Sequence, residues 1–507
     1  MGERVGVGLA LQHSKEVEEM RQQGWLVEWE ELVEREMKEA RVPGFVMGVN
    51  LNGKSLFRKS FGYRDREKQL EITPDTVMGL ASVTKSFTCM AIMQLQEAKK
   101  LSVHDPVIKY LPEFRTPDRQ KTEQMTIHHF MTHTTGMPPL PIDNLAIRNS
   151  MLEDMADEDN PLHRYLKKEY QKPIYTFEEL MEALALAEYE LVGSPGQLFS
   201  YSNDCYSLLG AIIARVSGKS YDVYVKEHIL EPADMKSSTF LLSDLPHLPD
   251  VTTIYHSKES NGVSEIYPDP NWEDGLLVAA SGHLNSTVHD MLNYAEIFRT
   301  GGCVGKERIL SEESVKQMIH PHVKNSYSRY YGYGLFIQPD YYGGTLIKHG
   351  GAIKGVAAQL AIVPERGITS MALANLIGSP VEKATLTAFH AIEGRPLNTP
   401  QYQFETYSVP AAQLGEYVGR YVSGEGMDII VYVVEDVLMM IDKTSNAFGG
   451  KQLNYLLRPI GEHQFLIDRE GSEFTVGFVK GEDGSVTAMS LFYRIIPRVA
   501  AAEGSRV

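Results

Sequence analysis

Ser82 and Lys85 are the two residues of this chain whose types and spacing point most directly to chemistry. They form its only Ser-x-x-Lys sequence, and the mostly apolar residues 87–95 that follow predict a buried helix. Helix positions three apart share a face, so the amine would lie beside the hydroxyl. A serine hydroxyl becomes a nucleophile when a neighbouring base takes its proton, and burial lowers the pKa of a lysine enough for this task. The alternative is an N-capping serine followed by a solvent-exposed lysine.

Tyr201 and Asn203 form a second short motif, with groups suited to proton transfer and substrate binding. A phenol near two cations can be held as phenolate, take the serine proton and return it to the leaving group. The Asn203 amide can bond both Lys85 and a substrate carbonyl. The alternative is a packed tyrosine with an asparagine that caps a loop.

A third motif stands at the end of a predicted strand and consists of four residues, His349, Gly350, Gly351 and Ala352. Glycines at this place allow a substrate backbone to approach the strand edge. The N–H group of Ala352, paired with that of Ser82, would form an oxyanion hole. The alternative is a glycine turn between two strands with an incidental histidine.

The elements that would position these motifs come from both ends of the first 395 residues. A helix near residues 25–41 and a hairpin near residues 45–57 precede the Ser82 helix, and a mostly helical middle follows it. Strands then come at residues 334–337, 344–348, 356–363 and 368–373, before a helix near residues 381–392. We therefore expect a sheet built from both ends of the domain, with a helical region inserted between them.

Two segments interrupt this pattern. Residues 138–176, rich in Pro, Asp and Glu, predict an insertion that serves either as a flap beside the site or as surface decoration. Three prolines near residues 396–410 predict a linker, and the short strands after it, separated by turns, suggest an antiparallel barrel. The predicted divisions are an N-terminal extension (1–24), a first domain (25–395), the linker (396–410) and a barrel domain (411–507).

Composition excludes several classes of function. A chain of 507 residues exceeds what one hydrophobic core supports, and its net charge of −17 argues against a nucleic-acid partner. Three distant cysteines predict neither a disulfide framework nor a metal cluster, and the histidines are spread along the chain without a His-Glu-x-x-His pattern. No apolar run is long enough to span a membrane, and no signal sequence opens the chain. We expect a cytoplasmic protein without a metal or cofactor.

The three motifs, in their order along the chain, resemble those of the penicillin-recognising serine hydrolases: class C β-lactamases, DD-peptidases, and related esterases and D-amino-acid peptidases. The resemblance spans residues 25–395 and includes supporting stretches at residues 131–136 and 286–290. It implies an α+β fold, in which an antiparallel sheet is flanked by helices and joined to an all-helical region. By strand pattern alone, residues 411–507 resemble the lipocalin-like barrel attached to some members.

The resemblance also implies a role for each residue that handles protons. In it, Ser82 is acylated, and Lys85 and Tyr201 share the proton transfers. Asn203 positions the substrate. The sequence shows no Glu-x-x-Leu-Asn stretch of the class A type, so the deacylating water would rely on Tyr201.

On the strand side, the resemblance implies that Gly350 and Gly351 bind substrate and that the N–H groups of Ser82 and Ala352 form the oxyanion hole. His349 stands where many β-lactamases have a lysine. A histidine is mostly neutral at pH 7 unless its surroundings perturb it. It therefore anchors a substrate carboxylate less well than lysine, and we expect poor β-lactam hydrolysis.

The sequence thus predicts a metal-independent serine hydrolase that forms an acyl-enzyme on Ser82. Its substrates would be short peptides, including peptides with D-residues, or small esters. A β-lactamase is one alternative. Another is a non-catalytic penicillin-binding sensor or scaffold, although a scaffold has no need of Lys85 and Tyr201 together. Assembly into a homo-oligomer is left open.

Overall fold

A nine-stranded antiparallel sheet forms the centre of the first domain. The structure is a computed structural model that describes residues 24–153, 166–167, 172–260, 263–402, 404, 407–444, 453–469 and 472–499. The strands of this sheet are β1 (Gly44–Leu51), β2 (Lys54–Asp65), β3 (Leu70–Glu71), β10 (Val323–Ser326), β11 (Arg329–Tyr331), β12 (Phe336–Tyr341), β13 (Gly344–Ile353), β14 (Val356–Val363) and β15 (Ile368–Ala374).

The strand order joins the two ends of this domain. It runs β10-β11-β12-β13-β14-β15-β1-β2-β3, so β1 pairs with β15, and Met47 lies opposite Ala372. The prediction of a sheet built from both ends is confirmed. The hairpin predicted near residues 45–57 is longer than expected, because β2 continues to Asp65.

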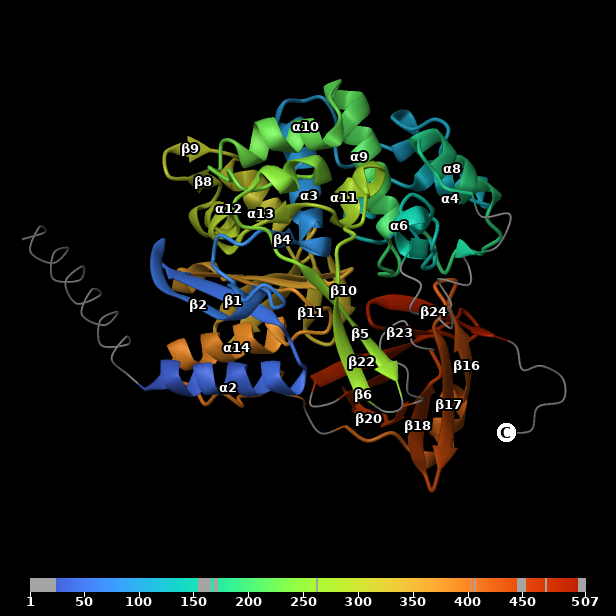
Figure 1. Ribbon diagram of the computed structural model, residues 1–507. Helices are drawn as coiled ribbons and strands as arrows, with labels where there is room; N and C mark the ends of the chain where they lie inside the picture. The colour runs from blue at the N-terminus through green and yellow to red at the C-terminus, as the bar shows by residue number, and fades with distance from the viewer. Residues whose placement is uncertain are drawn as a thin grey trace, which may run out of the picture.

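Helices cover both faces of the sheet (Figure 1). On one face lie α2 (Trp25–Glu39) and α14 (Val381–Ile392), and the helical region covers the other. α2 turns three residues inward at four-residue spacing, namely Trp29, Val33 and Met37. Because both faces are covered, every residue of β14 is buried.

The helix after Ser82 runs through the middle of the helical region. It is α3 (Thr84–Glu97), packed against α9 (Asn203–Ser217) and α11 (Ala279–Gly282). All its residues from Thr84 to Met93 are buried, the polar Lys85 and Ser86 among them. The prediction of a buried helix at this place is confirmed.

Shorter elements complete the helical region. The other described α-helices are α4 (Arg119–Gln124), α5 (Ile127–Met131), α6 (Arg148–Glu153), α8 (Phe177–Leu186), α10 (Tyr221–Val225), α12 (Val288–Thr300) and α13 (Glu312–Met318). Three short ribbons pair β4 (Met78–Gly79) with β7 (Asn285–Ser286), β5 (Ile254–Ser260) with β6 (Val263–Asp269), and β8 (Cys303–Val304) with β9 (Glu307–Arg308). Of the predicted insertion at residues 138–176, residues 154–165 and 168–171 lie outside the described part.

The C-terminal residues form a second nine-stranded antiparallel sheet, curled into a nearly closed barrel. After the short helix α15 (Ala411–Leu414), its strands are β16 (Gly419–Val422), β17 (Asp428–Val434), β18 (Val437–Asp442), β19 (Leu453–Leu456), β20 (Arg458–Gly461), β21 (Gln464–Arg469), β22 (Ser472–Lys480), β23 (Val486–Leu491) and β24 (Arg494–Val499). Their order is β19-β18-β17-β16-β24-β23-β22-β21-β20, and β19 contacts β21 across the ends of the sheet.

Alternation along the strands fills the barrel interior. Ile429 and Val431 of β17 are buried, whereas their neighbours on the strand are less so, because successive side chains point to opposite faces. The fold class predicted from the sequence, including a C-terminal antiparallel barrel, is confirmed. The likeness of this barrel to lipocalins in particular stays a prediction.

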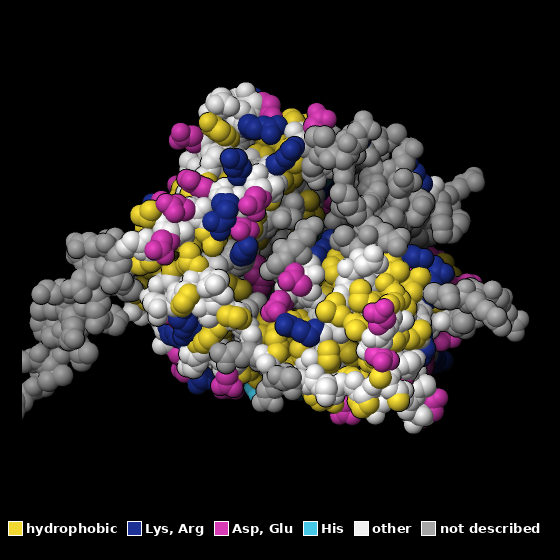
Figure 2. Space-filling view, turned by 90° about the horizontal axis from the view of Figure 1, so that it is seen from below, with side chains coloured by type: hydrophobic (Ala, Val, Ile, Leu, Met, Phe, Trp, Pro, Cys, Tyr) yellow, Lys and Arg dark blue, Asp and Glu magenta, His cyan; other side chains and the backbone are white. Residues whose placement is uncertain are grey.

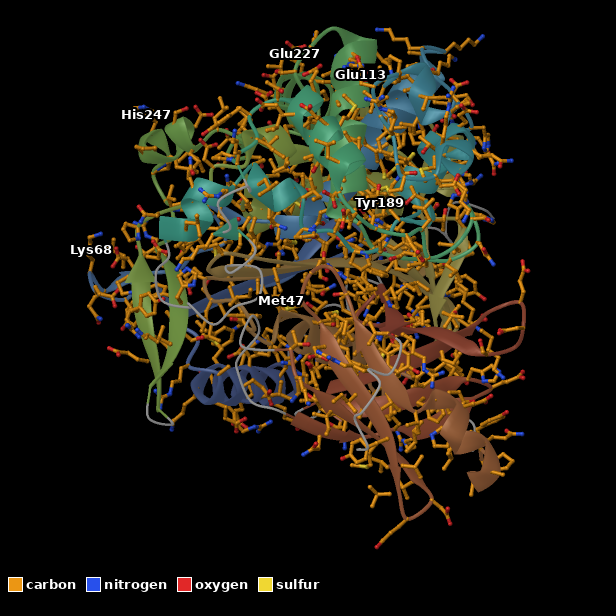
Figure 3. The ribbon with its side chains drawn as sticks, turned by 90° about the vertical axis from the view of Figure 1, so that its right-hand side faces the viewer. Met47, Lys68, Glu113, Tyr189, Glu227 and His247 are labelled. Atoms are coloured by element: carbon orange, nitrogen blue, oxygen red, sulfur yellow. The ribbon has the colours of Figure 1, made fainter. Side chains whose placement is uncertain are left out.

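The barrel lies against the first domain, where β22 contacts β10. In the side view of Figure 3, the helical region with Glu113 and Tyr189 stands above Met47 of the sheet, and the barrel strands lie below. None of the described helices is both long and apolar enough to cross a bilayer.

Candidate active site

Ser82 lies in a single 3₁₀ turn, Ala81–Val83, that leads directly into α3. The preceding Ala81 has a φ of 47°, a left-handed conformation that residues other than glycine adopt infrequently. β13 passes directly against this turn, since a Cβ on Gly351 would stand 2.2 Å from the Leu80 carbonyl oxygen. The structure therefore brings the first and third sequence motifs together.

Lys85 is fully buried, and its amine contacts the hydroxyl that it would deprotonate. Nζ donates hydrogen bonds to Ser82 Oγ at 3.2 Å, to Asn203 Oδ1 at 2.8 Å and to the Ser281 carbonyl. Burial lowers the pKa of Lys85 from 10.5 to about 7, against the opposing charge of Asp143. A large share of this amine is therefore neutral at pH 7 and able to accept a proton.

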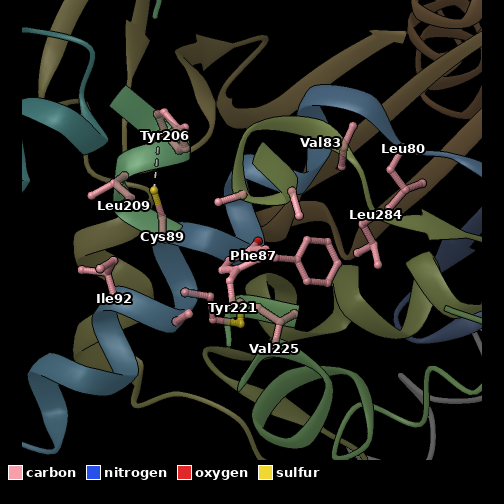
Figure 4. Packing of buried hydrophobic residues seen from close by; sticks show 14 of the residues in the cluster. Leu80, Val83, Phe87, Cys89, Ile92, Tyr206, Leu209, Tyr221, Val225 and Leu284 are labelled. Carbon is pink, nitrogen blue, oxygen red and sulfur yellow. Dashed lines mark hydrogen bonds between the residues drawn. The ribbon is translucent and has the colours of Figure 1, made fainter. Parts of the chain in front are cut away.

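The packing of α3 explains why Lys85 is removed from water. One turn after Lys85, Cys89 Sγ lies 3.3 Å from Tyr206 OH of α9, as the dashed line in Figure 4 marks. Phe87 stacks on Tyr294 of α12, with ring centroids 3.7 Å apart. Such close packing surrounds the helix with side chains, and the amine is bonded by Ser82, Asn203 and the Ser281 carbonyl.

Tyr201 lies within hydrogen-bond reach of the Ser82 hydroxyl and has two cations near its ring. Lys85 Nζ and the guanidinium carbon of Arg494 each lie 4.9 Å from the ring centroid, and His133 stacks on the ring with centroids 4.2 Å apart. Burial raises the pKa of Tyr201, whereas the hydrogen bond with Ser82 and the charge of Arg494 lower it. The sequence predicted a phenol near two cations, and Lys85 is one of them. Arg494, the other cation, was not identified from the sequence.

Asn203 is placed by the start of α9. Ser202 is the N-cap of this helix, and its hydroxyl accepts a hydrogen bond from Cys205 N. Ser202 N in turn donates to His133 Nδ1 at 3.1 Å. His133 belongs to one of the supporting stretches of the sequence, which had assigned it no role; here it fixes the turn that carries Tyr201 and Asn203.

The end of β13 offers a strand edge to a substrate. Pairing with β12 stops at Lys348, opposite Phe336, whereas pairing with β14 continues to Ile353. Among the described residues, the outer edge from His349 to Ala352 therefore has no strand partner, and it borders the Ser82 turn. An extended backbone can add to such an edge.

His349, and not Lys348, faces the site. His349 Nε2 lies 3.2 Å from Tyr331 OH, and Nδ1 lies 2.6 Å from the Gly350 carbonyl oxygen. Burial, together with the charge of Lys85, lowers the pKa of His349 to about 3. The imidazole is therefore neutral at pH 7. Lys348 points to the opposite face, because successive side chains of a strand alternate, and it forms an ion pair with Glu382 of α14.

The barrel domain reaches the site, which the sequence motifs did not indicate. Tyr201 N donates a hydrogen bond to Tyr493 O at 2.9 Å, and Arg329 of β11 donates to Tyr493 OH at 3.0 Å. Phe336 packs on Tyr493, with ring centroids 4.6 Å apart. No local pattern in the sequence ties this hairpin to Tyr201. The indication that the sequence offers is a pair of bulky residues, Phe492 and Tyr493, which in the structure form a two-residue turn.

Two buried carboxyl groups lie behind Lys85. Asp204 Oδ1 accepts a hydrogen bond from Asp143 N at 2.8 Å. Burial raises the pKa of Asp143 to about 7 and that of Asp204 well above its usual range. Asp143 belongs to the insertion predicted at residues 138–176, so the described part of this insertion helps to form the surroundings of Lys85.

The histidines that are spread along the sequence partly gather in space. The rings of His128 and His322 have centroids 5.2 Å apart, and His104, His129 and His320 stand next to them. Within the described ranges, no group of three or more His, Cys, Asp or Glu side chains is placed to hold a metal ion.

Comparison with known proteins gives a family model and several relatives. Residues 29–394 match the model described as beta-lactamase. Penicillin-binding protein 4* of Bacillus subtilis is 25% identical over 448 residues, which cover 85% of this chain and 91% of that protein.

Solved structures are similar over most of the chain. The octameric penicillin-binding protein homologue from Pyrococcus abyssi is 27% identical, with a TM-score of 0.64, and the match covers 93% of this chain and 99% of that one. A D-stereospecific amidohydrolase from Streptomyces sp. is 21% identical, with a TM-score of 0.54, over 68% of this chain and 93% of that one. This second likeness shows the fold alone.

Proposed function

The chain belongs to the beta-lactamase family of serine hydrolases, and we propose that it cleaves amide or ester bonds through an acyl-enzyme on Ser82. One observation carries this proposal: a fully buried Lys85, with a pKa of about 7, lies 3.2 Å from the Ser82 hydroxyl. The same amine bonds Asn203. A lysine buried in this way is poised to accept a proton near neutral pH.

Acylation begins with the Ser82 proton. Lys85, in its neutral form, and Tyr201 share this proton while Oγ attacks the substrate carbonyl. The developing oxyanion is stabilised by the N–H groups of Ser82 and Ala352. The same proton then passes to the leaving amine or alcohol as the bond to the carbonyl carbon breaks.

Deacylation repeats these transfers with water. Tyr201 and Lys85 take a proton from the water that attacks the acyl carbon, and they return it to Ser82 Oγ as the acid product leaves. Asn203 holds Lys85 and the substrate carbonyl in register during both halves. The enzyme ends with the protons that it had at the start.

Short peptides fit the open edge of β13, where an extended backbone can lie beside Gly350 and Gly351. We include peptides with D-residues because a protein of the same fold is described as a D-stereospecific amidohydrolase. A β-lactamase is less favoured, because the neutral His349 supplies no cation for a substrate carboxylate.

The test is hydrolysis of p-nitrophenyl acetate by two alanine variants. Ser82→Ala should lose all enzymatic turnover, since it removes the nucleophile. Ser207→Ala is the matched control, because this buried serine lies on the neighbouring helix α9 and its hydroxyl bonds no described residue. It should keep wild-type turnover. Wild-type activity in Ser82→Ala would refute the proposal.

We also propose that the protein self-associates through the barrel. Hydrophobic side chains are exposed over the barrel side of the molecule in Figure 2. The large ones in the described strands β17 to β19 are Val433, Val434, Val437 and Leu456. Exposed apolar clusters of this kind mark association surfaces, and the Pyrococcus relative is described as octameric. Light scattering should show an oligomer that Val434→Asp dissociates; a monomeric wild type would exclude it.

A further inference from the structure

We propose that Arg494, which the barrel places beside Tyr201, is a positioning residue whose charge keeps Lys85 and Tyr201 ready to take the Ser82 proton. The inference rests on the proposed serine mechanism and extends it to a domain that holds none of the three motifs. Arg494 neither gives nor takes a proton in this scheme, because a guanidinium stays charged at all relevant pH values.

The hairpin that carries Arg494 is fixed to the site by its backbone. Phe492 and Tyr493 form the two-residue turn between β23 and β24, with φ values of 47° and 67°. Such a turn requires positive φ, which bulky residues adopt with strain. The bonds from Tyr201 N and Arg329 hold Tyr493 in this turn. These contacts offset the strain and fix the position of the hairpin against the site.

The Arg494 side chain is also held in place. Its Nε donates to Glu425 Oε2 at 3.0 Å, from the loop between β16 and β17, and 22% of the side chain is exposed. Its guanidinium carbon and Lys85 Nζ both lie 4.9 Å from the centroid of the Tyr201 ring. The two cationic groups are therefore no more than about 10 Å apart, a distance at which charges inside a protein interact measurably.

The other ionisable groups around Lys85 leave Arg494 as the main fixed charge. Those on the packed elements are Asp143, Asp204, Cys89, His133, His283, His349, Tyr201, Tyr206 and Arg494. Burial, together with the charge of Asp143, raises the pKa of Asp204 well above its usual range, which disfavours its charged form. Burial lowers the pKa of each of these histidines and raises that of Cys89 and of both tyrosines, so all six are neutral at pH 7. Asp143, with its pKa raised to about 7, is only partly charged.

The direction of the effect follows from the sign of these charges. A cation near Lys85 disfavours the ammonium form, and the same cation favours the Tyr201 phenolate. Both changes help to remove the Ser82 proton. Glu425 acts in the opposite direction by partly neutralising Arg494. For two charges about 10 Å apart, the expected effect on the pKa of Lys85 is about half a unit to one unit.

The experiment is the pH profile of kcat/KM on p-nitrophenyl acetate, whose acid limb reports the protonation of the free enzyme. Arg494→Gln should move this limb upward by about half to one pH unit. Arg494→Lys, which keeps the charge, should leave it near the wild-type position. Glu425→Gln should move it downward. Arg420→Gln removes an exposed arginine elsewhere on the barrel, paired with Asp428, and should change nothing.

Three results would overturn the inference. The first is an unchanged acid limb in Arg494→Gln together with a raised KM, which would make Arg494 a substrate contact. The second is an equal shift in Arg494→Lys, which would make shape rather than charge responsible. The third is an unchanged limb in Glu425→Gln, which decides the matter even if Arg494→Gln fails to fold. If the wild type shows no Ser82-dependent turnover at all, the proposed function fails instead.

Discussion

Replacing Lys85 by methionine should greatly lower activity and yet stabilise the protein. Methionine has nearly the volume of lysine and suits the apolar surroundings of α3. The amine that it removes is fully buried, and burial lowers its pKa from 10.5 to about 7. At pH 7, a shift of this size corresponds to about 4 kcal/mol of unfavourable free energy in the folded state.

Part of this gain is lost because two acceptors lose their donor. Without the amine, Asn203 Oδ1 and the Ser281 carbonyl lack the hydrogen bonds that Lys85 donates, at about 1 kcal/mol or slightly more each. The net stabilisation at pH 7 is therefore about 1–2 kcal/mol, or a rise in Tm of a few degrees. Activity should fall by about a hundredfold or more in kcat.

The gain should also depend on pH in a defined direction. Between about pH 7 and pH 10.5, the unfolded chain binds a proton on Lys85 that the folded chain has released. Wild-type stability therefore rises with pH through this window, relative to Lys85→Met, which lacks the group. The advantage of the variant should be nearly constant below pH 7 and vanish at about pH 9. Toward pH 10.5 the variant should be the less stable protein, because only the cost of the two lost hydrogen bonds is left there.

Thermal unfolding of wild type and variant across this pH range is the assay. Lys348→Met is the matched control. Burial lowers the pKa of Lys348 to about 8 as well, but this amine is paired with Glu382, and its removal leaves that carboxylate without its partner, which offsets the gain. This control should be active and should show no gain in stability. A Lys85→Met protein that is less stable than wild type at pH 7, or that keeps the wild-type kcat, would refute a desolvated catalytic base.

The remaining predictions concern Tyr201, the glycines of β13 and β-lactams. Tyr201→Phe should lower kcat by about a hundredfold without raising KM; a change in KM alone would leave Tyr201 a packing residue. Gly351→Ala should lose activity and stability, because its Cβ would meet the Leu80 carbonyl oxygen at 2.2 Å, whereas Gly350→Ala meets only a side-chain end at 3.2 Å and should be milder. Nitrocefin should be turned over with kcat/KM below about 10⁴ M⁻¹s⁻¹; a higher value would favour a β-lactamase.

The parts that could be predicted from the sequence are those with local patterns. Alternating and apolar runs indicated the strands, and three short motifs indicated Ser82, Tyr201 and His349. The spacing of Ser82 and Lys85 is a helical one, so their contact follows from the helix itself. That β1 pairs with β15 could be expected because the strands at both ends of the domain read as one sheet.

The parts that could not be predicted depend on contacts between distant segments. Arg494 belongs to a barrel hairpin, and nothing in its neighbours along the chain refers to Tyr201. Asp143 looked like one more acid of a polar insertion, yet it is buried beside Asp204. Charge and burial of this kind are set by tertiary packing, which a one-dimensional pattern does not encode.

The most direct test of the account is the site and rate at which a fluorophosphonate labels the protein. Peptide mass spectrometry should find one adduct, on Ser82 of the wild type, with loss of fluoride. Ser82→Ala should give no adduct, and Lys85→Met should be labelled far more slowly, because its hydroxyl lacks the neighbouring base. An adduct on another residue, or equal labelling rates in wild type and Lys85→Met, would contradict the claim that Lys85 activates Ser82.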